Sequence, residues 1–226
     1  GLFFTGNELV EPGKPLPPGK IYDSNRYTLS GLLQTMGCEL IDLGVVPDDL
    51  ESTKAALQQA AAQADLVITS GGVSVGEEDY IRIALVQLGE LTLWRIAILP
   101  GKPRAFGVVG DTPFIGLPGN PVSAFVTYCL FVSPFIKSMQ GRLEVLPRQL
   151  SVKAAFDWPK AGKRQEYLRA KIVLGEEGQS VVDIFSHQGS GVLTSTSWAD
   201  GLVVIPVGET VRTGDFVNYI PFTEML

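Results

Sequence analysis

Ser70-Gly71-Gly72-Val73-Ser74-Val75-Gly76-Glu77-Glu78-Asp79 is the stretch that decides the fold of this chain. The apolar run Asp65–Thr69 before it predicts a buried strand, and Tyr80–Leu88 after it predicts a helix. A glycine-rich turn between a strand and a helix presents several backbone N–H groups, and these can hold a phosphate or another oxyanion. The carboxylate of Asp79 adds a group that can bind a metal ion or steer a reacting group. The stretch therefore predicts an α/β unit that binds a phosphorylated ligand.

Strands and helices alternate over residues 1–140. We expect strands at Leu2–Thr5, Glu39–Leu43, Leu66–Thr69, Leu93–Leu99 and Phe114–Leu117, and helices at Asn25–Met36, Leu50–Gln63, Ile81–Leu88 and Ser123–Met139, the last interrupted at Pro134. This order predicts a mainly parallel sheet with helices on both faces. Ligands bind at the carboxyl ends of strands in such folds, so we expect the turns after Thr5, Thr69 and Leu117 to share one edge.

The second part of the chain has a different pattern, with short strand-prone runs separated by turns. These runs are Leu150–Ala155, Tyr167–Leu174, Val181–Phe185, Gly201–Ile205 and Phe216–Ile220. They predict a small all-β barrel or sandwich. We place an α/β domain at residues 1–146 and a β-barrel domain at residues 147–226. Because the chain opens directly on a core-strand pattern, we expect it to be the C-terminal part of a longer protein.

Composition limits the functions to consider. The net charge of −6 argues against nonspecific nucleic-acid binding, which needs a basic surface. We expect Cys38 and Cys129 to be buried free thiols, because both lie in apolar, helix-like contexts. The sequence shows neither a signal peptide nor an uninterrupted apolar run of about eighteen residues, so we expect a cytoplasmic protein that does not associate with membranes.

Gly116-Leu117-Pro118-Gly119-Asn120-Pro121-Val122-Ser123 is the second motif that indicates chemistry. Its two prolines fix φ, and Gly119 between them allows a tight backbone path. We expect Ser123 to cap the following helix and to offer a hydroxyl group at its positive end. The alternative is a rigid connection between a strand and a helix, without a role in binding.

Lys102 lies in a third motif, Pro100-Gly101-Lys102-Pro103, which would hold its positive charge in a fixed direction after a strand. The alternative is a solvated lysine in a turn. The spacing is not that of a P-loop.

Three acidic residues, Glu8, Asp48 and Asp79, each follow a predicted strand end. Carboxylates that converge there could bind Mg²⁺, which prefers few carboxylates together with substrate oxygens. Each is otherwise a helix cap or a surface charge. His187 is the only histidine, so a histidine-based triad or zinc site lacks partners.

Arginines and a tight turn mark the β-rich part. Arg164 and Arg169 lie near a strand start, and Gln188-Gly189-Ser190-Gly191 forms a turn with a hydroxyl group. The planar donor fork of arginine suits tetrahedral oxyanions. The alternative is a set of surface charges on a barrel.

Together these motifs resemble the molybdenum-cofactor insertion family, which comprises MoeA-type molybdopterin molybdenumtransferases and the gephyrin E domain. The resemblance covers nearly the whole chain. Its residues are Thr5-Gly6-Asn7-Glu8-Leu9, Asp23-Ser24-Asn25, Ser70–Gly76 with Asp79, Pro100–Pro103, Leu117–Ser123, Arg164–Arg169 and Gly189-Ser190-Gly191. It implies a MogA-like molybdopterin-binding domain followed by the family's C-terminal barrel.

The resemblance also implies a reaction and a site. The family inserts molybdate into the dithiolene of molybdopterin, using adenylated molybdopterin and Mg²⁺, and works as a homodimer. By position, Ser70, Gly71, Gly72, Ser74, Pro118, Gly119, Asn120 and Pro121 would cradle the pterin phosphate and neighbouring groups. Glu8, Asp48 and Asp79 would be the catalytic acids, with Asp48 and Asp79 as the Mg²⁺ ligands. Ser74, Arg95, Lys102, Ser123, Arg164 or Arg169, and Ser190 would bind or guide molybdate.

The chain departs from the family at several points. Asn7 stands where the family often has aspartate, and Leu99 stands where it often has lysine, so Arg95 and Lys102 remain as the positive charges there. The two N-terminal domains of the family are absent. These departures leave a molybdopterin-binding scaffold without transferase activity as an alternative. A MogA-like adenylyltransferase is a more distant one, which the predicted barrel and the motif Arg164–Arg169 disfavour.

Overall fold

The computed structural model describes residues 1–71, 80–93, 98–101 and 105–226. It divides into two compact units, and each is built around its own sheet. The first unit comprises residues 1–96 and 103–120, and the second comprises residues 97–102 and 121–226.

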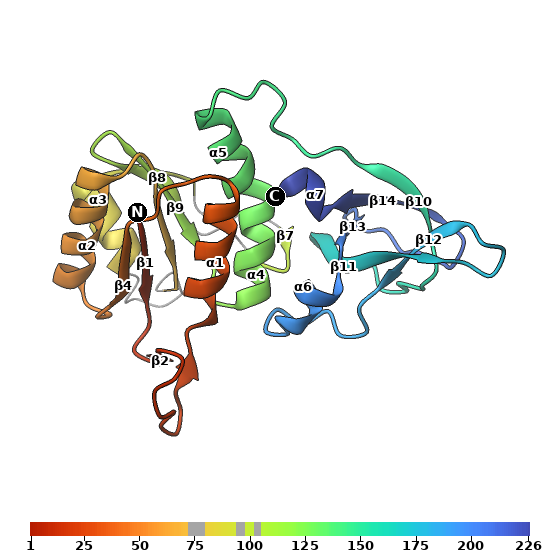
Figure 1. Ribbon diagram of the computed structural model, residues 1–226, viewed down its shortest axis with the longest axis horizontal. Coiled ribbons are helices and arrows are strands. Elements are labelled where there is room, and N and C mark those ends of the chain that lie inside the picture. The colour runs from red at the N-terminus through yellow and green to blue at the C-terminus, as the bar shows by residue number, and fades with distance from the viewer. Residues whose placement is uncertain (72–79, 94–97, 102–104) are drawn as a thin grey trace. The chain divides into compact units, whose positions relative to one another are not determined.

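A six-stranded sheet forms the centre of the first unit, in the order β4-β1-β5-β9-β8-β6 (Figure 1). Its strands are β1 (Leu2–Thr5), β4 (Asp42–Val46), β5 (Val67–Ser70), β6 (Gly89–Leu93), β8 (Ala105–Val109) and β9 (Thr112–Leu117). The pairs β4–β1, β1–β5 and β5–β9 are parallel, whereas β9–β8 and β8–β6 are antiparallel. The predicted fold class, a parallel-rich sheet with helices, is confirmed.

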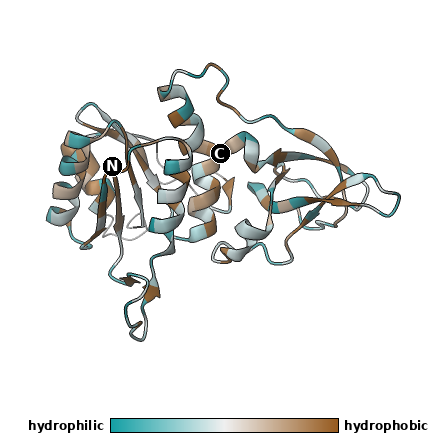
Figure 2. Ribbon diagram, viewed as in Figure 1, coloured by the Kyte–Doolittle hydropathy of each residue, from teal (hydrophilic) through white to brown (hydrophobic). Residues whose placement is uncertain are grey.

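Helices cover both faces of this sheet. In Figure 1, α2 (Leu50–Gln63) and α3 (Tyr80–Leu88) lie on one side, and α1 (Ser24–Thr35) lies on the other. Buried apolar side chains of α2 and α3 form one core cluster with strand residues such as Phe3 and Phe114. Figure 2 shows the strands mostly brown and the two helices banded with teal, as amphipathic helices over a buried sheet should be.

The helix ends follow local sequence signals. The side chain of Asp23 accepts a hydrogen bond from the backbone N–H of Arg26 and so caps α1, which stops before Gly37 at φ +74°. Asp49 caps α2 in the same way by accepting from Ser52. The predicted helix Leu50–Gln63 therefore has the bounds that the structure shows.

Two strand predictions in this region need correction. The strand expected at Leu93–Leu99 is wrong, because β6 ends at Leu93 and β7 (Ile98–Leu99) pairs in parallel with a strand of the second unit. The strand β8 was not predicted; it forms a hairpin with β9 through a two-residue turn at Gly110 and Asp111. The strand expected at Glu39–Leu43 lies three residues later, as β4.

The second unit contains a closed barrel of five strands. They are β10 (Leu150–Ala154), β11 (Gln165–Leu174), β12 (Ser180–Ile184), β13 (Gly201–Ile205) and β14 (Phe216–Pro221). Their order is β12-β10-β14-β13-β11, and the pairing of β11 with β12 closes the sheet. All five predicted strands are present within two residues of their expected bounds, and closure selects the barrel over the sandwich.

A continuous helical run precedes the barrel. It consists of α4 (Pro121–Thr127), a π-helical stretch (Tyr128–Val132) and α5 (Ser133–Met139). The expected interruption coincides with Pro134, which lies in the first turn of α5 and lacks the N–H that a regular helix would use. By length and composition these 19 residues could cross a membrane, but 72% of the most apolar window is buried, as in the core helix of a globular protein.

Candidate functional site

The carboxyl ends of four parallel strands meet at one edge of the first sheet. Thr5 of β1 lies beside Val46 of β4, and Ser70 of β5 lies beside Leu117 of β9. The turns that follow these strands carry Glu8, Asp48, Gly71 and Pro118–Asn120. The structure therefore brings the predicted turns to a shared edge, which is where α/β sheets bind ligands.

Ser70 ties two of these turns together. Its side chain is 1% exposed, and its hydroxyl group donates a hydrogen bond of 2.9 Å to the carbonyl oxygen of Pro118. The same oxygen accepts a bond of 2.8 Å from Nδ2 of Asn25, which also donates to the carbonyl oxygen of Gly119 at 2.8 Å. We call these four residues the Asn25 knot. The hydroxyl of Ser70 is used inside the protein and acts by positioning the turns.

Asn25 is a functional candidate that the sequence analysis did not place in the site. It lies in the first turn of α1, and its amide reaches both β5 and the turn after β9. The available signal was its place in the motif Asp23-Ser24-Asn25. Nothing local in that motif indicates partners so far along the chain, so the role was missed.

Gly71 makes the closest approach in this edge. Its φ is +94°, and a Cβ added there would lie 2.2 Å from the carbonyl oxygen of Thr5. Only glycine fits, because any side chain would enter the backbone of β1. The next predicted site residues, Gly72, Ser74 and Asp79, lie outside the described residues, as do Arg95 and Lys102.

The turn after β9 has a buried base and an exposed tip. Pro118 is buried, whereas Gly119 and Asn120 are exposed. The carbonyl oxygens of Pro118 and Gly119 point to Ser70 and Asn25, which fixes the backbone while the tip stays accessible. This arrangement suits a turn that contacts a ligand through its exposed residues.

The prediction that Ser123 caps a helix is wrong. The helix α4 begins at Pro121, so Ser123 is its third residue and is 2% exposed. Proline favours the first helical position because its fixed φ is helical and its missing N–H would have no partner there. Gly101 packs against this turn, since a Cβ on it would lie 3.0 Å from Cβ of Ser123.

The acidic residues do not form a complete metal site among the residues that the structure describes. Glu8 is exposed and its carboxylate lies against Gly6, where an added Cβ would be 2.7 Å from Oε2. Asp48 is half-buried in the turn before α2. Within the described ranges, no three His, Cys, Asp or Glu residues come together as metal ligands. The Mg²⁺ hypothesis therefore depends on Asp79.

Arg169 is the largest fully buried side chain in the described part of the chain. Its Nε donates to Oγ of Ser195 at 3.0 Å, and its Nη2 donates to the carbonyl oxygens of Gly189 at 3.1 Å and His187 at 3.4 Å. Its Nη1 is buried and has no partner among the described residues. Burial lowers the pKa of the guanidinium to about 10. Arg169 is thus an internal cation that holds the turn at residues 187–190.

This turn in turn contacts the start of α4. The carbonyl oxygen of Ser190 accepts a hydrogen bond of 3.0 Å from the backbone N–H of Val122. Arg164 has a different environment, since it is half-buried and its Nη1 reaches only the carbonyl oxygen of Ile98, at 3.5 Å. The two predicted arginines therefore do different things: Arg169 positions a turn, and Arg164 is the one nearer solvent. His187 accepts a bond at Nδ1 from the backbone of Gly189.

The parallel-rich sheet with its edge of tight turns, together with a separate five-stranded barrel, defines a class of α/β ligand-binding proteins with a β-barrel domain. Residues 1–138 match the family model of a probable molybdopterin binding domain, and residues 151–222 match the model of the MoeA C-terminal region, domain IV. The chain belongs to the MoeA family of molybdopterin-binding proteins, and the predicted resemblance is confirmed.

Similar proteins carry names from the same biosynthesis. A molybdopterin molybdenumtransferase of Haemophilus influenzae is 42% identical over 228 residues, which cover all of this chain and 56% of that protein. The Drosophila melanogaster molybdenum cofactor synthesis protein cinnamon is 38% identical over 93% of this chain and 35% of its own length. The chain thus spans only part of the curated relatives it matches, about half of the bacterial one.

Solved structures show the same fold. Two structures of molybdopterin biosynthesis MoeA proteins from Pyrococcus horikoshii match with TM-scores of 0.82 and 0.72, at 34% and 26% identity. They cover 98% and 97% of this chain, which spans 53% and 52% of theirs.

Proposed function

We propose that this chain serves molybdenum cofactor biosynthesis as the molybdopterin-binding part of a molybdopterin molybdenumtransferase. The relatives that carry this name support the activity, and the match to a probable molybdopterin binding domain supports the ligand. The reaction would insert molybdate into the dithiolene of molybdopterin, which arrives in adenylated form. Residues 1–146 would bind molybdopterin, and residues 147–226 would form the family's barrel domain.

The Asn25 knot is the observation that supports this function best. One buried amide fixes the turns after β5 and β9 at the edge where parallel sheets bind ligands. Fixed turns present backbone N–H groups without a cost of reorganisation when an anion binds. Phosphate, pyrophosphate and molybdate are all anions that such a site would favour.

We assign roles to the predicted residues as follows. Ser70, Gly71, Gly72, Ser74, Pro118, Gly119, Asn120 and Pro121 form the cradle for the pterin phosphate, with Ser70 acting through the turns. Molybdate is a dianion and needs fixed donors and positive charge, for which Ser74, Arg95, Lys102, Ser123, Arg164 and Ser190 are the candidates. Arg169 supports this set by holding the turn that carries Ser190.

Mg²⁺ is proposed as the metal of the reaction, held by Asp48 and Asp79 beside Glu8. When bound, it would neutralise phosphate charge and orient the leaving group. We expect Asp79→Ala to abolish Mg²⁺-dependent insertion without unfolding the protein. Glu51→Ala, at a side chain that is 81% exposed on α2, is the matched control and should keep activity. An active Asp79→Ala protein would refute this assignment.

A turnover assay with adenylated molybdopterin, molybdate and Mg²⁺ tests the function. It should compare this chain with a longer protein that also carries the two N-terminal domains of the family. Formation of the molybdenum cofactor by either one supports the transferase. If neither forms it and both bind molybdopterin, the protein is a scaffold, and Leu99 in place of the usual lysine becomes the first residue to test. ATP-dependent adenylation of molybdopterin would instead indicate an adenylyltransferase.

The setting of the reaction is also proposed. We expect a homodimer in the cytoplasm, without nucleic-acid or membrane partners. Sedimentation of the longer protein would test the dimer directly. A monomer at micromolar concentration would contradict it.

A further inference from the structure

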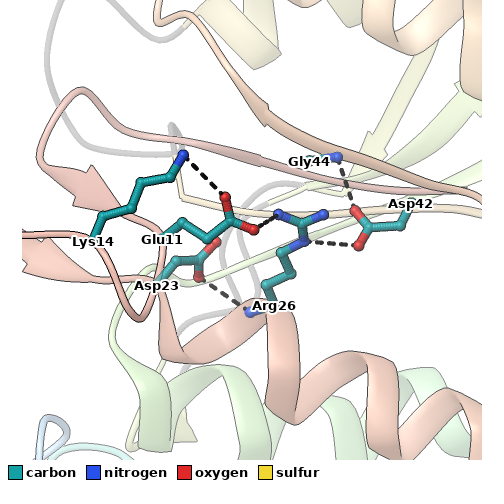
Figure 3. Close-up of polar contacts among 6 residues, drawn as sticks. All are labelled: Glu11, Lys14, Asp23, Arg26, Asp42 and Gly44. Atoms are coloured by element: carbon teal, nitrogen blue, oxygen red, sulfur yellow. Dashed lines mark hydrogen bonds and ion pairs between the residues drawn. The ribbon is translucent and has the colours of Figure 1, made fainter.

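The N-terminal end of α1 borders a pocket of about 380 Å³ in the first unit. Leu9, Tyr27 and Val45 give it an apolar wall, and Glu11, Asp23 and Arg26 give it a polar one. Figure 3 shows how the polar side chains lie around this space. We call it the Asp23 pocket. Its volume is in the range of sites for small organic ligands.

Two cations at the pocket are neutralised by two carboxylates. Nε of Arg26 lies 2.7 Å from Oδ2 of Asp42, and Nη1 of Arg26 lies 3.4 Å from Oε1 of Glu11. Nζ of Lys14 lies 3.4 Å from Oε2 of Glu11. Figure 3 shows this chain of ion pairs from Lys14 to Asp42. The positive charges around the pocket are therefore already balanced.

Asp23 is the carboxylate that remains. Its residue is 3% exposed, and Oδ1 accepts the hydrogen bond of 3.1 Å from the backbone N–H of Arg26 that caps α1. Oδ2 is buried and has no hydrogen-bond partner among the described residues. A buried carboxylate oxygen without a donor is costly, because it has lost its water without a replacement. The pocket thus lacks one donor of positive charge.

We propose that the Asp23 pocket binds a small organic cation, an amidinium or guanidinium group on a compact apolar body. The N–H groups of the cation would donate to Oδ2 of Asp23, and its body would cover Leu9, Tyr27 and Val45. This is a site separate from the reaction proposed above and does not depend on it. The charge balance at Arg26 and Lys14 leaves Asp23 to select the cation, and the apolar wall selects against a fully hydrated ion.

Benzamidine and its neutral isostere benzamide are the probes. We expect benzamidine to cause saturable shifts in a ¹H–¹⁵N spectrum of the full chain, centred on the backbone amides of Leu9, Tyr27 and Val45. Benzamide should shift them at least about tenfold more weakly, because it offers no charge to Asp23. Free arginine amide, titrated in parallel, distinguishes an aliphatic guanidinium from the aromatic amidinium.

Asp23→Asn is the decisive variant. Asparagine caps helices as well as aspartate does, so α1 should remain while the negative charge is removed. The affinity for benzamidine should fall by about tenfold or more. Glu51→Gln, on the exposed surface of α2, should bind as the wild type does.

Three results would overturn the proposal: no saturable shifts with benzamidine, equal binding of benzamidine and benzamide, or equal affinity in Asp23→Asn. The comparison of the two probes uses only the wild-type protein. It therefore decides the question even if Asp23→Asn fails to fold.

Discussion

Nδ2 of Asn25 lies 2.8 Å from the hydroxyl oxygen of Ser70, and the two residues are 45 positions apart in the chain. The same nitrogen holds the carbonyl oxygen of Gly119, which lies 94 positions from Asn25. One side chain of α1 thus fixes the ends of β5 and β9, where the candidate site is built. The geometry of the site depends on this amide as much as on the turns themselves.

Asn25→Ala should weaken the first unit. It removes both donors and leaves two buried acceptors unpaired, which costs roughly 1–3 kcal/mol in the free energy of unfolding. Denaturation in urea measures the loss, and a double-mutant cycle with Ser70→Ala should give a coupling of about 0.5–3 kcal/mol. Asn120→Ala, at an exposed position, should change stability by less than about 0.5 kcal/mol. Additive effects of Asn25→Ala and Ser70→Ala would contradict the knot.

Gly71→Ala should be far more damaging than an alanine at another glycine with positive φ. Gly37 is the matched control, since its φ is +74° and an added Cβ would meet nothing within 4 Å. Gly37→Ala should cost about 1–2 kcal/mol, from the left-handed backbone alone. Gly71→Ala adds the contact of 2.2 Å with Thr5 and should lower the unfolding free energy by at least about 2 kcal/mol more. Similar losses in the two variants would show that the turn moves aside easily.

Arg169→Met should loosen the turn at residues 187–190. Methionine fills much of the space but cannot donate to Gly189, His187 or Ser195. Hydrogen exchange at the backbone amide of Val122, which bonds to Ser190, should then become roughly tenfold faster or more.

Arg164→Met is the control for that experiment. Arg164 makes only a long bond to Ile98, so its loss should leave exchange at Val122 unchanged. Equal exchange rates in the two variants would mean that Arg169 does not support the turn.

Asp23 should give the protein a recognisable dependence on pH. Burial raises the pKa of its carboxyl group, and the backbone N–H of Arg26 only partly opposes this. Because the native pKa is above the unfolded value of about 3.9, the contribution of Asp23 to stability is full below that pH. It is lost as the pH rises through the native pKa. The unfolding free energy of the wild type relative to Asp23→Asn should fall over that window.

Asp49 provides a control of opposite sign. Its pKa is lowered by hydrogen bonds from the backbone and side chain of Ser52. Its contribution should therefore be present above the unfolded pKa and be lost as the pH falls. The same difference measured for Asp49→Asn should change with pH in the opposite direction. Parallel curves for the two variants would contradict the environment of Asp23.

Much of the fold could be predicted because its signals are local. The alternation of apolar and polar residues marks β10 to β14, and the cap at Asp49 with an alanine-rich run marks α2. The strand β7 could not be found in this way, since its two residues are strand-like only through their pairing with β11. The cap expected at Ser123 failed because Pro121 starts the helix two residues earlier.

The sequence by itself determined the two-part architecture, the family and the turns that carry the candidate site, because glycine, proline and apolar periodicity act within a few residues. Only the tertiary structure decided what the side chains in those turns do. It buried Ser70 and Arg169 in structural hydrogen bonds, brought Asn25 to Gly119, and left Oδ2 of Asp23 without a donor. These outcomes depend on desolvation and on contacts between residues far apart in the chain, and neither is written in a local pattern.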